Sequence, residues 1–536
     1  MSKRRFWGWG YDDAGPTPDQ QSRMAETLAD RFGLDGLTLT RPPTVAELDL
    51  PAPRLLPPSS IADLCTTDPE ERAGHTYGKS FRDVVRALAR DFRNPPDLVA
   101  LPRTERDVAA LLDWCADAGA AAIPYGGGSS VVGGVEPDVE DEYAGVMTID
   151  LRELDQVVEL DRTSRAARVQ AGIYGPALET ALRPHGLTLR HFPQSFELST
   201  VGGWIATRSG GHYATLFTHI DDFVESLRVV TPRGVLETRR LPGSGAGPSP
   251  DRLLIGSEGV LGIITEAWMR LQDRPRFRAS AVGRFAEWDD GVTAARALAQ
   301  SGLFPSNCRL LDATEAMVTG TDDGSAHVLL VAFESADHAL DAWVARSVEV
   351  VRDHRGVVDD SAIRTSSRSD AVVRPDAADA WRNAFLRAPY ARDTLVQLGL
   401  VNETFETAIT WNKFDALYAH VMDSVRDAMG RVGAEPGIVT CRFTHVYPDG
   451  PAPYFTVIAN GRKGAQLEQW EAIKAAASDA IIESGGTITH HHAVGRDHRP
   501  GYDRQRPPLF AEALRAAKHA LDPTGILNPG VLVDPT

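Results

Sequence analysis

Hydrophobic and polar positions alternate most clearly between residues 97 and 130. Leu98 to Leu101 has the short apolar pattern of a buried strand, and Thr104 is placed to cap a helix that ends at Gly119. The apolar residues of that helix recur on one face, at Val108, Leu111, Leu112 and Cys115. Ala121 to Tyr125 has the pattern of a second buried strand. Together they predict a β-α-β unit whose second strand leads directly into a glycine loop.

Strand patterns continue to about residue 275, at Val146 to Leu151, Val157 to Leu160 and Ala167 to Ala171. Beyond that point strand and helical patterns alternate, which favours helices packed on a mostly antiparallel sheet. The strands there include Val328 to Phe333 and Tyr454 to Ala459, and the helices include Ala339 to Val351 and Leu467 to Ser484. An α+β fold with at least two domains follows.

We divide the chain into four parts on this basis. Residues 1–93 form a mainly helical N-terminal arm, 94–275 a nucleotide-binding domain, and 276–500 a second domain. Residues 501–536 form a C-terminal helix and tail that packs back on the nucleotide-binding domain. The apolar face of that helix consists of Phe510, Leu514, Ala517 and Leu521, and Pro523 stops it.

Composition narrows the range of functions. A formal charge of -17 over 536 residues repels nucleic acid phosphates, so we expect no nucleic-acid partner. Four cysteines without a CxxC spacing argue against disulfides and a thiolate metal site. No apolar run approaches the roughly 18 residues of a membrane span, and the first ten residues lack the apolar core of a secretion signal. We therefore expect a soluble, cytoplasmic protein that acts on small molecules.

The glycine loop is the first candidate site. Gly126, Gly127 and Gly128 let the backbone approach a ligand closely, and Ser129 and Ser130 can donate to a pyrophosphate. A tight turn without a ligand is an equal alternative, because the loop has neither the GxGxxG spacing of a Rossmann fold nor the Gly-Lys-Ser/Thr of a P-loop.

Later fragments decide between these alternatives. Gln194 to Trp204, Thr207 to Gly211 and Gly256 to Ile264, in this order, resemble the FAD domain of the vanillyl-alcohol oxidase and p-cresol methylhydroxylase superfamily. The resemblance implies a two-subdomain FAD-binding domain of the p-cresol methylhydroxylase type, followed by an α+β substrate domain with a mostly antiparallel sheet. Some members attach the flavin to a histidine of the glycine loop. Here Ser129 or a neighbour takes that place, so we expect FAD to be held noncovalently.

The implied FAD contacts fall into four segments. They are Pro124, Tyr125, Gly126, Gly127, Gly128, Ser129 and Ser130; Gln194, Ser195, Phe196, Glu197, Leu198, Ser199 and Thr200; Thr207, Arg208, Ser209 and Gly210; and Glu258, Gly259, Val260, Leu261, Gly262, Ile263 and Ile264.

Further segments narrow the resemblance to the alkyldihydroxyacetonephosphate synthase family. They are Trp7 to Tyr11, Phe196 to Trp204, Val229 to Gly234, Arg309 to Asp312, Phe405 to Thr407, Thr440 to Arg442 and His490 to His492. This family exchanges the acyl chain of acyl-dihydroxyacetone phosphate for a fatty alcohol in ether-lipid synthesis. The resemblance implies that the flavin serves as a covalent scaffold without net oxidation.

The run His490-His491-His492 is the most distinctive segment. Three adjacent imidazoles are costly to bury, which favours a site over a solvated or core histidine. Thr487 to Thr489 has strand character, so we expect His490 and His492 to share one face and His491 to point the opposite way. A histidine-only metal site would have to recruit His445 or His498.

We expect no metal. Relatives that oxidise D-lactate and similar hydroxy acids carry a metal-binding His-x-x-x-Asp-Gly-Asn-x-His, and the first histidine survives here as His445 while the second is replaced. By resemblance the family's catalytic tyrosine is Tyr454. A tyrosine in an apolar strand is ordinarily a core residue, so the assignment depends on the family alone.

Two arginines complete the candidate site by resemblance. Arg392 matches the family's substrate arginine, and its guanidinium suits a phosphate or carboxylate. A surface ion pair with Asp393 or a neighbour is the plainer alternative. Arg309 matches an arginine that the family needs for activity, either in the chemistry or in holding the site together.

Group transfer on a lipid-like phosphorylated small molecule is therefore the leading hypothesis, with peripheral membrane contact and a homodimer left open. The alternative is an FAD-linked oxidoreductase acting on a D-2-hydroxy acid or alcohol. Asn528-Pro529-Gly530 and Ala493 resemble those relatives more closely. An inactive flavin-stabilised scaffold is the third hypothesis, and the retained histidines, Tyr454 and arginines argue against it.

Overall fold

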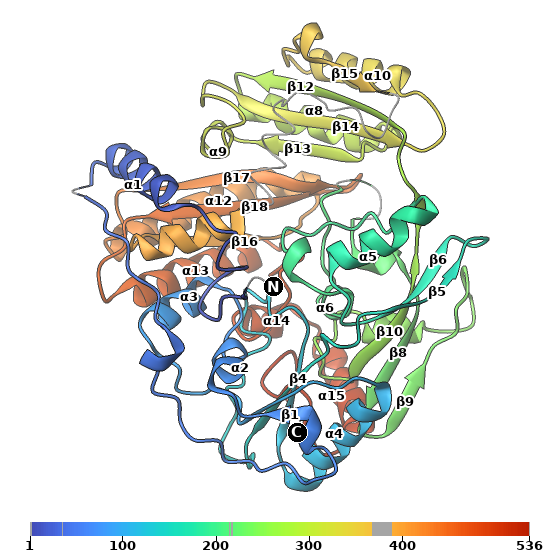
Figure 1. The fold of residues 1–536 in the computed structure, drawn as a ribbon. Coiled ribbons are helices and arrows are strands. Elements are labelled where there is room, and N and C mark those ends of the chain that lie inside the picture. Colours follow the sequence, from blue (N-terminus) through green and yellow to red (C-terminus); the bar gives the residue numbers. More distant parts are fainter. Residues whose placement is uncertain (1–2, 35, 214, 216–217, 367–387, 535–536) are drawn as a thin grey trace.

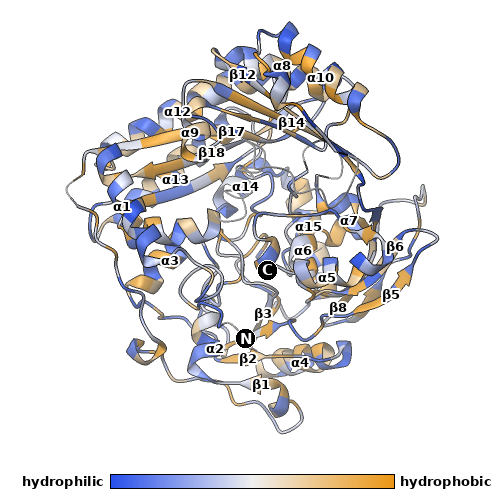
Figure 2. Cartoon of the chain, turned by 45° about the horizontal axis from the view of Figure 1, so that its top comes forward, coloured by the Kyte–Doolittle hydropathy of each residue, from blue (hydrophilic) through white to orange (hydrophobic). Residues whose placement is uncertain are grey.

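A computed structural model describes residues 3–34, 36–213, 215, 218–366 and 388–534. The N-terminal arm contains α1 (Pro18–Phe32), α2 (Pro69–Gly74) and α3 (Phe81–Leu88). Helix α1 lies beside the second domain, where Phe32 packs with Leu398, Leu400 and Ile458 (Figure 1). Apart from that contact α1 is largely hydrophilic (Figure 2), as expected of a peripheral helix.

The predicted β-α-β unit is confirmed. Strand β2 (Leu98–Ala100) and β3 (Ala121–Tyr125) both pair in parallel with β4 (Val146–Asp150), and β1 (Cys65–Thr66) adds an antiparallel edge. Helix α4 (Glu105–Ala118) connects β2 to β3. Its Thr104 cap accepts from the Asp107 N–H, and Gly119 ends it at φ +64°, a conformation that glycine adopts without strain.

A second, antiparallel sheet completes the first domain. Its strand order is β5 (Val157–Asp161), β6 (Ala166–Gln170), β10 (Ile263–Arg270), β8 (Val224–Thr231) and β9 (Gly234–Glu237). Helices α5 (Gly175–Leu182), α6 (Val201–Ala206) and α7 (Pro250–Leu254) and the short strands β7 (Leu187–Thr188) and β11 (Gln272–Asp273) accompany it. Both sheets share one apolar core, which includes Leu111 and Leu227.

The second domain is built on one seven-stranded sheet, and every strand pair in it is antiparallel. The order is β15 (Arg364–Ser366), β12 (Phe277–Phe285), β14 (His327–Ser335), β13 (Asn307–Leu311), β17 (Gly437–Val446), β18 (Pro451–Ala459) and β16 (Val401–Glu406). Helices α8 (Trp288–Gln300), α10 (Asp341–Asp353), α12 (Trp411–Arg431) and α13 (Gln466–Glu483) bury its apolar face. The short α9 (Ala313–Val318) covers Leu311, Val328 and Leu330 on the other face.

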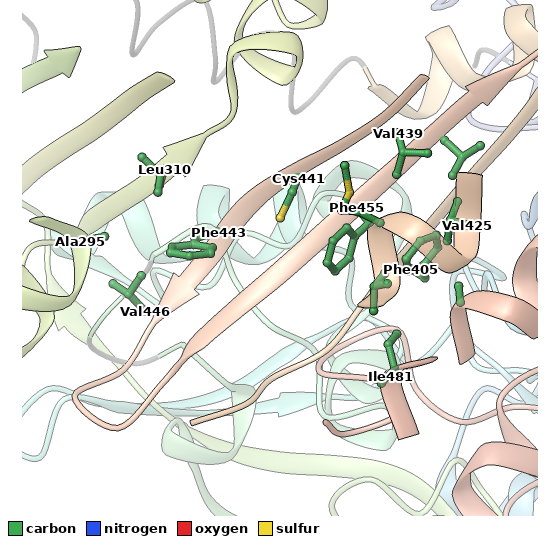
Figure 3. Close-up of a cluster of buried hydrophobic side chains, with 14 of the residues drawn as sticks. Ala295, Leu310, Phe405, Val425, Val439, Cys441, Phe443, Val446, Phe455 and Ile481 are labelled. Atoms are coloured by element: carbon green, nitrogen blue, oxygen red, sulfur yellow. The ribbon is translucent and has the colours of Figure 1, made fainter. Parts of the chain in front are cut away.

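Alternation along the strands explains the two faces of this sheet. Phe405, Cys441 and Phe455 point into the helix-covered core, as Figure 3 shows. Their chain neighbours therefore point the opposite way. In the middle of the sheet that opposite face is polar, and it is the face turned toward the first domain.

The C-terminal residues return to the glycine loop. After α14 (Arg499–Gln505) and α15 (Pro508–Leu521), the chain runs beside β3, where the Ala122 N–H donates to Ile526 O and the Asn528 N–H donates to Ala122 O. Among the described helices, none has the length and hydrophobicity needed to cross a bilayer.

Candidate active site

A cavity of about 480 Å³ lies between the glycine loop and the polar face of the seven-stranded sheet. The wall on the side of the first domain contains all of Pro124 to Ser130, with parts of the segments 194–200, 207–210 and 258–264. The wall on the side of the second domain contains Arg309, Arg392, Arg442, His445, Tyr454, His491 and His492. Residues far apart in the sequence thus face one another across this space.

The glycine loop packs too closely for side chains. A Cβ atom on Gly126 would lie 2.3 Å from Thr200 Oγ1, and one on Gly127 would lie 2.1 Å from the Leu198 carbonyl oxygen. Gly128 has φ +59°, which glycine tolerates best. The loop therefore presents bare backbone, with Ser129 and Ser130, to the cavity. This donor set fits a pyrophosphate, and an FAD would be held here by backbone N–H groups and hydroxyls.

Most of the implied FAD contacts line the cavity, and six lie outside its wall. Val260 and Leu261 belong to the apolar core of the first domain. The Arg208 guanidinium is 2.9 Å from the Asp221 carboxylate. The remaining three are Phe196, Glu197 and Leu198, in a short 3-10 turn. These segments therefore line the cavity only in part, because some of their side chains are directed into the core or toward other partners.

An arginine of the N-terminal arm donates hydrogen bonds to the backbone of the glycine loop. Arg4 donates to the carbonyl oxygens of Gly127 and Leu198 and, at 2.8 Å, to the Tyr174 hydroxyl. It therefore joins the two segments that the resemblance assigns to FAD. Sequence reasoning assigned no chemistry to this arm, and a basic residue near a chain end carries no signal of such a contact.

Glu258 connects the flavin side of the cavity to the histidine segment. Its carboxylate accepts from the Val494 N–H at 2.9 Å and the Gly495 N–H at 2.8 Å, and its carbonyl oxygen accepts from Asn528 Nδ2 at 2.7 Å. Burial raises the pKa of Glu258 to about 7, although the two backbone N–H groups oppose the shift. The turn 257–259 is thereby fixed relative to residues 490–495.

Three residues of the second domain form one row across three strands. Glu406 of β16 lies opposite Tyr454 of β18, and Tyr454 lies opposite Arg442 of β17. Directly opposite residues share a face, so all three side chains turn to the cavity side. The register of the sheet thus brings a carboxylate, a phenol and a guanidinium together from positions 406, 454 and 442.

Arg442 lies over the ring of Tyr454. The guanidinium carbon is 3.9 Å from the ring centroid, within the range of a cation-π contact. The same guanidinium is ion-paired with the Glu315 carboxylate, whose other oxygen accepts from Thr440 Oγ1 at 2.5 Å. Arg442 was quoted only as part of the resemblance, and its contact with Tyr454 requires the strand register, which the sequence does not reveal.

Arg309 is one of the most deeply buried side chains, with an exposed fraction of 1%. Its Nη2 donates to the His212 carbonyl oxygen at 2.7 Å. Burial, together with the neighbouring charge of Arg442, lowers the pKa of Arg309 to about 9. Two guanidinium groups therefore lie close together on the cavity wall beside Tyr454.

Arg392 belongs to a separate wall of the cavity, where residues 388–397 are helical. Its Nη2 lies 3.7 Å from Glu403, and its buried Nε has no hydrogen-bond partner within the described residues. Asp393 accepts from the Trp9 N–H at 2.8 Å. The ion pair of Arg392 is with the neighbouring Glu403.

The histidine run is a loop whose backbone N–H groups point at the Glu406 carboxylate. The strand geometry expected for residues 487–492 is therefore wrong. The Glu406 carboxylate accepts from the backbone N–H groups of His490, His491 and His492. Burial acts to raise the pKa of Glu406, but the facing imidazoles hold it well below its ordinary value. The carboxylate of Glu406, on strand β16, thus determines the backbone conformation of the histidine run. The local pattern of Thr487 to Thr489 could not predict this contact.

The pairing of the imidazoles also differs from the expected alternation. His491 and His492 both line the cavity beside Tyr454, with ring centroids 6.1 and 5.6 Å from its ring and 4.8 Å from each other. His490 turns away to the Tyr447 hydroxyl, 2.7 Å from its Nε2. In the loop, consecutive side chains no longer alternate between two faces.

His445 joins the same cluster through a β-bulge between Phe443 and His445. Its Nε2 donates to the Gly211 carbonyl oxygen at 2.8 Å, which leaves a lone pair on the buried Nδ1. Ligand atoms of His445, His490 and His491 lie within 4.8 Å of one another, a group that could hold a metal ion. His498, the other candidate, instead contacts the Ala493 carbonyl oxygen at 2.9 Å.

Comparisons with known proteins show the chain to be similar to FAD-linked enzymes along most of its length. The family model for the FAD binding domain matches residues 96–239, and that for the C-terminal domain of FAD linked oxidases matches residues 274–532. An alkyldihydroxyacetonephosphate synthase of Dictyostelium discoideum is 30% identical over 489 residues, which cover 88% of this chain and 79% of that protein. A solved structure of an alkyldihydroxyacetonephosphate synthase is similar with a TM-score of 0.79 and 24% identity, covering 98% of both chains.

Oxidoreductases are similar as well. The glycolate oxidase subunit GlcD of Bacillus subtilis is 26% identical over 449 residues, which cover 82% of this chain and 89% of that protein. The sequence similarity therefore extends to both functional classes expected from the sequence, at higher identity for the synthase.

Proposed function

Because the chain belongs to the alkyldihydroxyacetonephosphate synthase family of FAD-linked enzymes, we propose that it exchanges the acyl group of an acyl-dihydroxyacetone phosphate for a fatty alcohol. The observation that carries the proposal is the row of Glu406, Tyr454 and Arg442 facing the glycine loop. Proton-transfer groups and cations meet there on one wall, opposite the loop that fits FAD.

The exchange balances without an external oxidant. The bond between the ester oxygen and the carbon of the dihydroxyacetone unit breaks, and the fatty acid leaves with both ester oxygens. The alcohol oxygen forms a new bond to that carbon and gives up its proton. Bound FAD supplies a ring that can bind the three-carbon unit between the two events and ends the cycle oxidised.

Tyr454 is the proposed proton-transfer residue. Its ring lies between Arg442 and the two cavity-lining histidines, so a proton at the phenol oxygen has basic neighbours and a phenolate would face positive charge. His491 and His492 are proposed to act in the same catalytic cluster, and His490 to support them. Arg309 adds a buried cation beside this cluster.

Arg392 is proposed to bind the phosphate of the substrate. Its Nε lies buried at the cavity wall without a hydrogen-bond partner among the described residues, and a planar guanidinium can bind two phosphate oxygens at once. Glu403 already neutralises part of its charge, but Lys474 also lies 2.9 Å from that carboxylate. The local charge therefore stays favourable to an anion.

FAD is proposed to be held noncovalently and without a metal beside it. The glycine loop carries Ser129 at the place where relatives attach a flavin through histidine, which supports noncovalent binding. Each of the imidazoles of His445, His490 and His491 already has a hydrogen-bond partner, which supports a cluster held together without an ion. Peripheral membrane contact and a homodimer stay predictions.

An FAD-linked oxidoreductase is the second candidate. The spacing of His445, His490 and His491 favours it, because a metal there would resemble the metal site of the relatives that oxidise D-lactate and similar hydroxy acids, against the expectation from the sequence. Similarity to glycolate oxidase subunit GlcD supports the same class. In that case a bound hydroxy acid would lose hydride to the flavin, which an external acceptor would reoxidise.

Purified protein tests the two candidates side by side. We expect a bound, extractable FAD and formation of alkyl-dihydroxyacetone phosphate from palmitoyl-dihydroxyacetone phosphate and hexadecanol. D-Lactate and glycolate should leave the flavin absorbance unchanged under anaerobic conditions. Bleaching by either hydroxy acid, without alkyl transfer, would replace the first candidate with the second.

A further inference from the structure

Three histidines form a chain of ring-to-ring hydrogen bonds beside the cavity. His219 Nε2 lies 3.1 Å from His490 Nε2, and His490 Nδ1 lies 3.1 Å from His491 Nδ1. A hydrogen bond between two ring nitrogens needs a proton on one and a lone pair on the other. The chain therefore has a direction, and the contacts at its two ends determine it.

The His219 end is fixed by a carbonyl group. His219 Nδ1 lies 3.2 Å from the Arg208 carbonyl oxygen, which can only accept, so this nitrogen carries a proton. Burial lowers the pKa of His219, which favours the neutral ring. Its Nε2 then has a lone pair. His490 must donate to it from Nε2.

The position of the proton on His491, at the other end of the chain, follows from the protonation of His219 and His490, and a contact with Glu406 supports it independently. A neutral His490 with its proton on Nε2 has a lone pair on Nδ1, so His491 donates from its own Nδ1. The Glu406 carboxylate lies 3.6 Å from that same His491 Nδ1 and favours a proton there. A neutral His491 is then left with a lone pair on Nε2. His491 lines the cavity and stacks on Tyr454 with an interplanar angle of 18°.

Tyr447 lies beside this chain without setting its direction. Its hydroxyl is 2.7 Å from His490 Nε2 and 3.3 Å from Thr218 Oγ1, so it can accept from His490 and donate to Thr218. If Tyr447 donated to His490 instead, the lone pairs of His490 and His219 would face each other at 3.1 Å. That arrangement is repulsive.

We propose that His219 is a positioning residue, which through His490 fixes the tautomer in which His491 presents an Nε2 lone pair to the cavity. The tautomer itself does not depend on the substrate, but its role in the reaction rests on the proposed function. As the alcohol oxygen bonds to carbon, its O–H bond breaks and the proton passes to His491 Nε2, from which it later leaves to solvent. The opposite tautomer would present an N–H group and could not accept that proton.

Substitution at the two partners of His490 tests the direction of the chain. His219→Phe removes the acceptor, and with it the lone-pair repulsion that prevents Tyr447 from donating to His490, so that the chain can reverse; we expect kcat to fall by roughly 10-fold to 100-fold, with KM and FAD content unchanged. Tyr447→Phe keeps the His219 acceptor and so keeps the direction of the chain. We therefore expect kcat to change by less than about threefold. His219→Gln, whose amide oxygen can accept, should restore most of the loss. His420→Phe, half-exposed on α12, is the matched control.

The reverse order of effects, with Tyr447→Phe damaging and His219→Phe silent, would overturn the proposal. A second readout does not depend on any substrate. Nitrogen-15 NMR of histidine-labelled protein, with His491→Gln to identify the signals, should show the proton of His491 on Nδ1 in the wild type and a different tautomer population in His219→Phe. A wild-type His491 protonated on Nε2 would contradict the inference even if alkyl transfer were confirmed, and a wrong substrate class would leave this NMR result unchanged.

Discussion

The Arg442 guanidinium carbon lies 3.9 Å from the centre of the Tyr454 ring, and the Glu315 carboxylate is ion-paired with the same guanidinium. The contact joins β17 to β18 on the cavity side of the sheet. Tyr454 thereby faces the cavity with the Arg442 guanidinium against its ring, and Glu315 holds that guanidinium in place.

Tyr454→Phe should reduce alkyl transfer by about 100-fold or more, because a positioned acid-base group contributes about 10² to 10⁴ in rate. The ring and its contact with Arg442 remain, so FAD content should not change. Steady-state kinetics and the flavin spectrum check both statements. Tyr418→Phe, on the helix-covered side of the sheet against Phe455, is the matched control and should be fully active. An active Tyr454→Phe enzyme would remove Tyr454 from the mechanism.

Glu315→Ala should destabilise the protein by about 3 to 5 kcal/mol, because it removes the buried carboxylate that is ion-paired with the buried Arg442 guanidinium. The midpoint of denaturant unfolding measures this. Activity should fall as well, since the guanidinium is no longer held over Tyr454. Glu349→Ala removes an exposed pair with Arg346 and should change stability by less than about 1 kcal/mol. Equal effects of the two substitutions would contradict the role given to Glu315.

Arg4→Ala should weaken FAD binding by about 10-fold to 100-fold, because a loss of about 1.5 to 3 kcal/mol, the contribution of one charge-assisted hydrogen bond to the order of the loop, lowers affinity by that factor. Titration of the apoprotein, followed by quenching of flavin fluorescence, gives the dissociation constant. Arg23→Ala on the exposed face of α1 is the control. Unchanged affinity would mean that the glycine loop holds its conformation without the N-terminal arm.

The stability of the protein should depend on pH through Asp393. Burial raises the pKa of this carboxyl to about 7, so between the unfolded value near 4 and about 7 the folded state binds more protons than the unfolded state. Stability must therefore fall as pH rises through this window, by at most about 4 kcal/mol from this group. Melting temperatures of wild type and Asp393→Asn should converge at about pH 4 and separate toward pH 8, with the variant higher. A constant difference would contradict the shifted pKa.

Metal analysis of the purified protein should find no stoichiometric ion, and a chelator should leave alkyl transfer unchanged. The His445, His490 and His491 cluster is the place where the opposite result would appear. One metal ion per chain, lost in His445→Ala, would show that this cluster is a metal site and would favour the oxidoreductase.

Local patterns predicted the parts of the fold that depend on local sequence. The β-α-β unit was predictable because Thr104 and Gly119 mark the ends of a helix between two apolar strands. The polar row of the cavity was not, because it depends on strand register: Arg442 and Tyr454 are opposite only once β17 and β18 pair. Likewise Glu406 shapes the histidine run from 84 to 86 positions away. Tyr454 itself could be named only through family resemblance.

The contact between Arg4 and the glycine loop could not be predicted from local sequence either. Arg4 reaches the glycine loop across 123 positions of sequence, and nothing in its local pattern indicates a ligand-binding segment nearby. The glycine loop was ambiguous by itself, because a tight turn was an equal alternative, and only its resemblance together with the later segments indicated a flavin site. The structure explains its glycines, because Thr200 and Leu198 approach too closely for side chains.

The central claim is that this cavity exchanges an acyl group for an alkyl group without net oxidation. Its most direct test is one anaerobic reaction with ¹⁸O-labelled hexadecanol and palmitoyl-dihydroxyacetone phosphate, in which the product is analysed by mass spectrometry and the flavin absorbance is recorded. We predict that the ether product carries the label, that unlabelled palmitate is released in equal amount, and that the flavin is oxidised again when substrate is exhausted. Palmitate carrying the label, or a flavin left reduced without ether product, would contradict this account.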